Sequence, residues 1–232
     1  MHDDIQTSDR CLWDGGGVHQ RPAKAAPCVS VRLISDASAK REGPTLVPLV
    51  TLQPVRLRWV NNNPDDPHDL CAHGDVEFRI GGDVLLDGSK GRDLTVSAAA
   101  LYLLRTLLVP HTKAAPLGDH LFPCCGFSMY DEPGEEDVVI CGCPNGEDFE
   151  ILHRLNGSGV LVRGKDGREW ELTWPEWTAA IFGFADRVSE FFAASTPKQP
   201  HDEVDTAGFR KFMAEWARRR GKQLGVIDTE RH

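Results

Sequence analysis

Cysteine and histidine side chains that could hold a metal ion occur in three short groups, Cys71-Ala-His73, Cys124-Cys125 and Cys141-Gly-Cys143. Side chains two positions apart in a strand point to the same side. Each spaced group could therefore direct both its ligands at one ion, whereas only one residue of the adjacent pair could do so. Zinc takes four sulfur or nitrogen ligands in a tetrahedron. The sequence thus offers a zinc site, whose candidate ligands are Cys71, His73, Cys141 and Cys143, with Cys124 or Cys125 as an additional ligand.

The spacing within these groups differs from established zinc motifs. Zinc ribbons separate paired ligands by about two to four residues, and here the gaps are one residue or none. A zinc deaminase needs a His and a Glu one residue apart, whereas three residues separate His73 from Glu77. Reduced cysteine also packs in protein cores as a small hydrophobe. Buried structural thiols are therefore the favoured interpretation, and a zinc-stabilised domain or zinc enzyme is the alternative.

Cys125 is also a candidate nucleophile, because Gly126 follows it and His111, His120 and His153 occur elsewhere in the chain. Thiol catalysis requires a thiolate stabilised by a nearby base or by a helix N-terminus. The sequence shows no such pairing. A cysteine-dependent enzyme is therefore a third hypothesis, behind the two above.

Arg105 is the one charged residue in a strongly apolar segment, Val96 to Val109. A buried guanidinium needs a carboxylate or carbonyl partner, since an unpaired buried charge is very costly. We expect a structural ion pair, with Asp186 as the candidate partner, in preference to an anionic ligand.

Acidic residues and histidines also gather between Asn61 and Asp75 and could bind a hard cation. The segment lacks the EF-hand pattern, however, and Asn, Asp and Pro are also typical of turns. A solvated loop is the favoured interpretation.

The composition limits the classes of protein to be considered. Hydrophobic residues make up 41% of the 232 residues and charged residues 26%, which is typical of a soluble globular protein. No secretory signal or membrane-length apolar stretch is found, and the odd cysteine count suits a reducing compartment, so we expect a cytoplasmic protein. The net charge of −9 argues against nucleic-acid binding, which needs a basic surface, and suits a basic protein partner.

Strand-like and helix-like patterns follow one another in blocks. We interpret residues 1–27 as a loose N-terminal arm and residues 28–232 as a single domain. Strands are expected at Val29–Ile34 and Leu46–Val60, in a hairpin over Val76–Leu86, and in a meander over Asp137–Thr173. Helices are expected from Thr95 or Ser97 to Val109, from a capping box at Thr173 to before Pro197, and near Asp205–Arg220. This order predicts an α+β fold, with a mostly antiparallel sheet packed by about three helices.

Common catalytic signatures are absent from the sequence. It contains no P-loop, no dinucleotide-binding glycine motif, no nucleophile elbow and no H-E-x-x-H. We therefore favour a non-catalytic protein-binding module, such as a bacterial immunity or inhibitor protein that neutralises a basic toxin. No cofactor is expected unless the Cys/His groups hold zinc, and the oligomeric state is left open.

Overall fold

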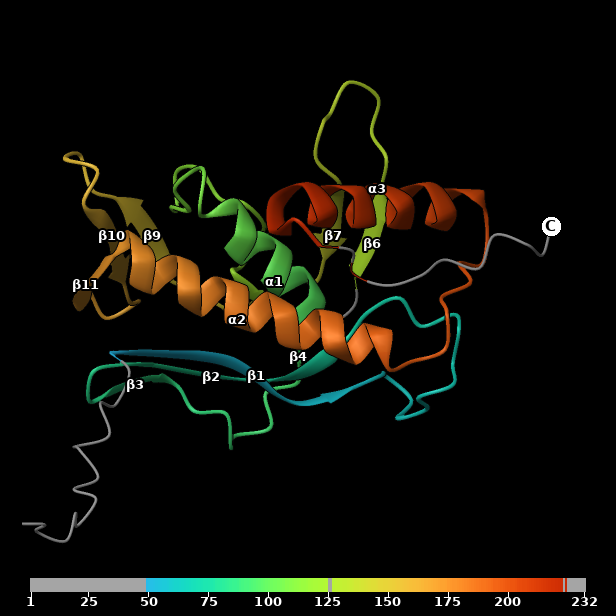
Figure 1. The fold of residues 1–232 in the computed structure, drawn as a ribbon, viewed down its shortest axis with the longest axis horizontal. Coiled ribbons are helices and arrows are strands. Elements are labelled where there is room, and N and C mark those ends of the chain that lie inside the picture. Colours follow the sequence, from blue (N-terminus) through green and yellow to red (C-terminus); the bar gives the residue numbers. More distant parts are fainter. Residues whose placement is uncertain (1–48, 125–126, 223, 225–232) are drawn as a thin grey trace, which may run out of the picture. The chain divides into compact units, whose positions relative to one another are not determined.

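The computed structural model describes residues 49–124, 127–222 and 224. The chain divides into two units, Met1–Thr45 and Leu46–His232, and the described residues belong to the second. The proposed arm, its boundary at residues 27–28, the expected strand at Val29–Ile34 and Cys125 lie outside the described residues. Within them the expected α+β fold is confirmed, because antiparallel strands form a hairpin and a C-terminal meander around three helices (Figure 1).

The largest sheet contains four strands. β1 (Val50–Arg58), β2 (His73–Ile80) and β3 (Asp83–Leu86) pair in that order, and β4 (Leu94–Thr95) pairs with the start of β2. The register of β1 against β2 shifts between Val55 and Arg58, and Arg56 in this bulge has a φ of +52°. A positive φ is unfavourable for a residue with a side chain. The bulge therefore makes the β1 end next to His73 the strained end of the sheet.

The C-terminal meander consists of β9 (Glu150–His153), β10 (Gly159–Arg163) and β11 (Glu169–Thr173) in the order β11-β10-β9. Gly167, with a φ of +81°, lies in the turn between β10 and β11. Two short pairs precede the meander. β5 (Phe122–Pro123) pairs with β8 (Gly146–Glu147), and β6 (Phe127–Tyr130) pairs with β7 (Val139–Gly142).

Local signals in the sequence explain where the three helices begin and end. α2 (Trp174–Ala193) opens with the predicted capping box, in which Thr173 and Glu176 each accept from the other's backbone N–H. α3 (Glu203–Arg220) begins at the Asp202 cap and ends at Gly221, which has a φ of +71°. α1 (Val96–Arg105) ends four residues before the predicted Val109. The reason is that Thr106 and Leu107 donate to carbonyls three residues back, which tightens the last turn ahead of Pro110.

The helices pack as the apolar patterns predict. Every residue of α1 is buried, and α2 lies across the four-stranded sheet beside α1 (Figure 1). On α2 the side chains of Trp177, Ile181, Phe184, Val188 and Phe192 are buried, whereas Phe191 is half-buried beside Trp59. α3 packs on β6, where Gly208 allows the close approach, since a Cβ there would lie 2.0 Å from the Met129 carbonyl oxygen. No helix in the described ranges is both long enough and apolar enough to cross a membrane.

Candidate functional site

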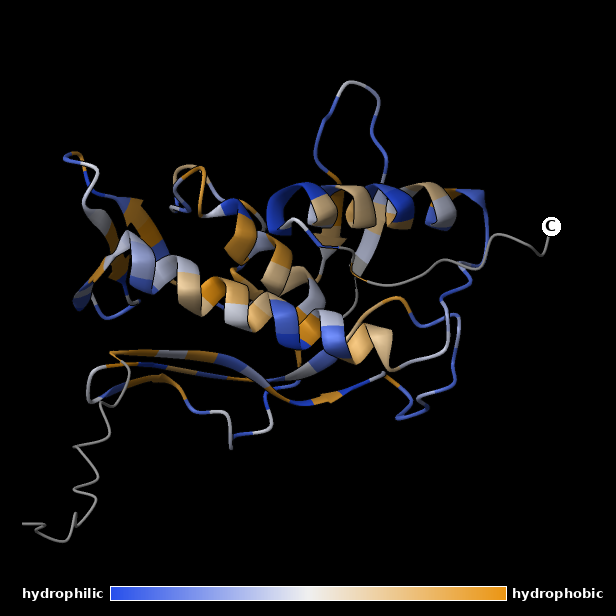
Figure 2. Ribbon diagram, viewed as in Figure 1, coloured by the Kyte–Doolittle hydropathy of each residue, from blue (hydrophilic) through white to orange (hydrophobic). Residues whose placement is uncertain are grey.

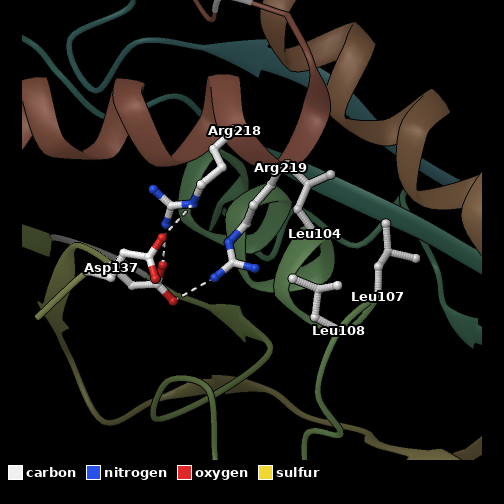
Figure 3. A pocket seen from close by; sticks show the side chains of 7 residues that line it. Leu104, Leu107, Leu108, Asp137, Arg218 and Arg219 are labelled. Atoms are coloured by element: carbon white, nitrogen blue, oxygen red, sulfur yellow. Dashed lines mark hydrogen bonds and ion pairs between the residues drawn. The ribbon is translucent and has the colours of Figure 1, made fainter.

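A pocket of about 450 Å³ opens between the end of α1, the last turn of α3 and the β6–β7 loop. Leu104, Leu107 and Leu108 form its apolar side, and Arg218 and Arg219 reach across from α3 toward Asp137 (Figure 3). Leu108 is 71% exposed, because α1 has already ended and the chain turns away toward Pro110. The pocket therefore combines an exposed aliphatic surface with paired charges.

Behind this pocket lies a buried ion network centred on Glu215 of α3. The side chain of Glu215 is 0% exposed and accepts two hydrogen bonds of 2.8 Å from Arg105 in a bidentate pair. It also accepts from the backbone N–H of Val138 at 2.9 Å and from Nε of Arg219 at 2.6 Å. Arg105 donates further to the carbonyls of Val138 and Leu117. Arg105 on α1, Val138 just before β7 and Glu215 on α3 are distant from one another in sequence, so the network fixes α3 against α1 and the segment that leads into β7.

The ionisation of this pair follows from its contacts. Burial alone would raise the pKa of Glu215, but the hydrogen bonds and charge of Arg105, with help from Arg219 and Val138, outweigh burial and lower it. Burial likewise opposes the charged form of Arg105, and Glu215 more than compensates, so the pKa of Arg105 is raised. Both groups are therefore charged in the folded protein near neutral pH.

The β6–β7 loop beside the pocket is strongly acidic. Its carboxylates belong to residues Asp131, Glu132, Glu135, Glu136 and Asp137. Figure 2 shows this loop as a hydrophilic projection beyond α3. Lys211 holds Asp131, and Arg218 and Arg219 hold Asp137. Glu132 and Glu135 have no cationic partner among the described residues, and both are exposed, so they are available to a positively charged molecule.

The structure corrects the proposed partner of Arg105. Asp186 instead accepts from Arg220, at 2.9 and 2.6 Å, and lies near Lys222. Glu215 was not among the predicted partners, because the sequence alone does not show which helix packs against Arg105. One signal was present, since Glu215 lies three residues after the buried Phe212 and so on the same side of the helix.

The candidate metal ligands occupy separate positions in the fold. His73 opens β2 opposite Arg58 and Thr95, and Cys71 lies in the preceding loop. Cys141 is exposed in β7 opposite Ser128. Cys143 lies beside Cys124, with their sulfur atoms 2.7 Å apart. Among the described residues, no three His, Cys, Asp or Glu side chains form a group that could hold a metal ion. Cys124 and Cys143 are therefore a pair of candidate ligands that the fold brings into contact.

His73 is a buried imidazole without a hydrogen bond. It is 4% exposed, and neither ring nitrogen has a partner in the described part of the chain. The nearest carboxylate, Asp93, lies 3.8 Å from Nδ1 and is itself paired with Arg58. Burial lowers the pKa of His73 in spite of the opposing charge of Asp93. The ring is therefore neutral in the folded protein at neutral pH.

Two of the histidines named as possible bases, His111 and His153, have structural partners. Leu117 donates to Nδ1 of His111, and the Nε2 of that ring lies 2.9 Å from Asp148. His153 lies 2.8 Å from the Thr106 carbonyl and packs edge-on against Trp174. In the loop from Asn61 to Asp75, Asp66 and Asp69 accept backbone N–H groups of the loop itself, as expected of turn residues.

The comparisons with known proteins add no relative. No protein-family model matches the chain, and neither a curated protein nor a solved structure is similar to it. Functional conclusions therefore depend on the geometry of the chain itself.

Proposed function

We propose that this chain is a non-catalytic protein-binding module that binds a basic partner through the pocket and the acidic loop beside it. The observation that carries the proposal is the exposed Leu108 at a pocket whose neighbouring loop holds two uncompensated carboxylates, Glu132 and Glu135. An aliphatic contact surrounded by charge is the usual arrangement of a protein-binding surface. Inhibition of a basic toxin, as by an immunity protein, is the specific form of this function that the net charge favours.

The two parts of this surface have different physical roles. Burial of Leu108 and Leu107 by a partner would supply most of the binding free energy, since apolar area removed from water is the main favourable contribution to association. The acidic loop would accelerate the encounter with a basic partner and select against acidic ones. The arginines of the pocket are already paired with Asp137 and Glu136, so they do not cancel the attraction of Glu132 and Glu135.

The test begins with a protein that copurifies with the chain. This partner is identified and then purified separately. Calorimetry should give a 1:1 complex with a basic protein, and its affinity should fall as salt is raised. Leu108→Asp should weaken binding at least about tenfold, since it places a charge in the apolar contact. Glu132→Gln combined with Glu135→Gln should weaken binding a few-fold and reduce its salt dependence.

Two matched controls make this result specific. Leu155 is fully exposed in the turn between β9 and β10, and Glu190 is exposed on α2. Leu155→Asp introduces the same change as Leu108→Asp, and Glu190→Gln neutralises one carboxylate, both away from the pocket, so both should leave the affinity unchanged. The proposal would be wrong if the partner were acidic, or if Leu108→Asp left the affinity as unchanged as Leu155→Asp.

A further inference from the structure

Cys124 and Cys143 are brought together by the pairing of β5 with β8. Pro123 lies opposite Gly146 in this pair, and the Cys124 N–H donates to the Asn145 carbonyl at 3.0 Å, which extends the pairing by one residue. The turn after β7 thereby folds back over the end of β5. Cys143, in that turn, also directs its sulfur toward the Asn145 carbonyl, at 3.7 Å. The contact between the two sulfurs is thus built by backbone pairing.

The separation of the two sulfurs distinguishes between the chemistries open to a cysteine pair. Two thiolates on one tetrahedral zinc ion, with Zn–S of about 2.3 Å, lie about 3.8 Å apart. A disulfide needs about 2.05 Å. The sulfurs of Cys124 and Cys143 are 2.7 Å apart, which is nearer to the separation in a disulfide than to that of two thiolates on one zinc ion.

We propose that Cys124 and Cys143 form a disulfide-exchange site that is oxidised by small disulfides such as oxidised glutathione. Cys143 lies in the turn and Cys124 packs against the hydrophobic core, so Cys143 is the sulfur that a small molecule meets first. The Cys143 thiolate attacks one sulfur of the glutathione disulfide and releases one glutathione thiolate. The Cys124 thiolate then attacks Sγ of Cys143 and releases the second. Two protein thiols are oxidised, one glutathione disulfide is reduced, and their two protons leave on two glutathione thiols.

The bond would close a loop that contains both strands of the β6–β7 pair and the acidic segment between them. That loop also supplies the Val138 contacts to Arg105 and Glu215, and Met129 beneath α3. A cross-link at its base restricts the unfolded chain and so favours the folded state. Oxidation would therefore strengthen the attachment of this hairpin without requiring the hairpin to move.

The test is carried out on the full chain after complete reduction, removal of the reductant and incubation with oxidised glutathione. Alkylation and intact-mass measurement should show the loss of two thiols. Cleavage after the acidic residues of 131–137 separates the two cysteines, so peptide mapping should recover a cross-link between Cys124 and Cys143. Cys124→Ser and Cys143→Ser should each abolish this cross-link, whereas Cys71→Ser, Cys141→Ser and Cys125→Ser should retain it. The oxidised wild type should melt at a higher temperature than the reduced protein, and Cys143→Ser should show no such shift.

Three outcomes would overturn the assignment. The first is that all thiols stay open to alkylation at excess oxidised glutathione. The second is that a bridge forms as readily in Cys143→Ser or maps to another pair. The third is that the purified protein carries stoichiometric zinc whose removal exposes Cys124 and Cys143, because this would assign the pair to a metal site.

Discussion

Glu215 and His73 are both buried and both ionisable, but their surroundings are opposite. Glu215 accepts four hydrogen bonds from Arg105, Arg219 and the Val138 N–H and keeps its charge. His73 has no hydrogen bond in the described part of the chain and is neutral. A side chain is removed from water with its charge only where other segments supply partners, and otherwise it is buried in its neutral form. The burial of Glu215 therefore depends on its charge, whereas the burial of His73 does not.

Lys198 lies between these two cases. It is 2% exposed, donates to the Asp66 carbonyl at 3.0 Å and lies 3.2 Å above the ring of Trp59. One carbonyl and an aromatic face replace only part of the hydration of an ammonium group. Burial accordingly lowers the pKa of Lys198 to about 8. For Glu215, Lys198 and His73, the stability of the folded protein should therefore depend to different degrees on the charge of the side chain.

The largest effect is expected for Glu215→Ala. This change leaves Arg105 buried without its carboxylate and removes the acceptor of the Val138 N–H. Breaking a buried ion pair from one side costs about 3–5 kcal/mol. Urea unfolding followed by circular dichroism measures the free energy of unfolding. Glu215→Gln, which keeps part of the hydrogen bonding, should cost less, and a loss below about 1 kcal/mol for both variants would show that the network contributes little.

Lys198→Met should change how stability responds to alkali. Between pH 8 and the ordinary lysine pKa of 10.5, the unfolded chain keeps a proton that folded Lys198 has released. Wild-type stability should therefore gain on the order of 2 kcal/mol as pH rises through this window, relative to the variant. Thermal melts from pH 8 to about 9.5 measure this gain in stability. The upper limit stays below the ordinary tyrosine pKa of about 10. Above it Tyr102 would oppose the gain, because burial raises the pKa of Tyr102 to about 12. Parallel pH profiles for the two proteins would contradict the partial pairing of Lys198.

His73→Leu should have little effect at pH 8, within about 1 kcal/mol in either direction, because it replaces an imidazole that has no hydrogen bond to lose. Its effect should appear in acid. The folded pKa of His73 lies below 6.5, so the unfolded chain binds the proton first and wild-type stability falls as pH drops below about 6.5. The variant should lack this part of the acid loss. The charges of Asp93, Asp69 and Arg58 surround this position in the wild type and in the variant. If the variant loses stability in acid as steeply as the wild type, the His73 ring is not buried in its neutral form.

The sequence predicted the elements of this fold better than the contacts of its polar residues. The capping box at Thr173 and the apolar segment that forms α1 depend on neighbours within one helix, so periodicity and local hydrogen bonding were sufficient to find them. The partner of Arg105 is 110 residues away. Several acids could satisfy the same electrostatic need, and the choice of Glu215 over Asp186 is made only when α3 packs on β6.

The cysteines show the same limit. Strand parity correctly indicates which side chains within one strand share a face, but it does not specify which strands meet. Cys143 was grouped with Cys141 by sequence, whereas the turn after β7 carries it to Cys124 at the end of β5. The zinc site of Cys71, His73, Cys141 and Cys143 needed β2 and β7 to present their ligands to one point. Among the described residues no group of three such ligands forms, and the contact that does form joins Cys124 with Cys143.

The smallest effect is expected for Asp186→Asn, which provides the exposed counterpart of Glu215→Ala. Asp186 makes two hydrogen bonds to Arg220, as many as Glu215 makes to Arg105, but its side chain is 30% exposed against 0% for Glu215. Water can replace the lost contacts at such a site, so the loss should be about 0.5 kcal/mol and should shrink further in high salt. Urea unfolding at low and high salt measures both quantities. Equal losses for Asp186→Asn and Glu215→Ala would mean that burial is not what makes the Arg105 pair important, and the difference between the buried pair and the exposed pair would then have to be argued from the number of hydrogen bonds alone.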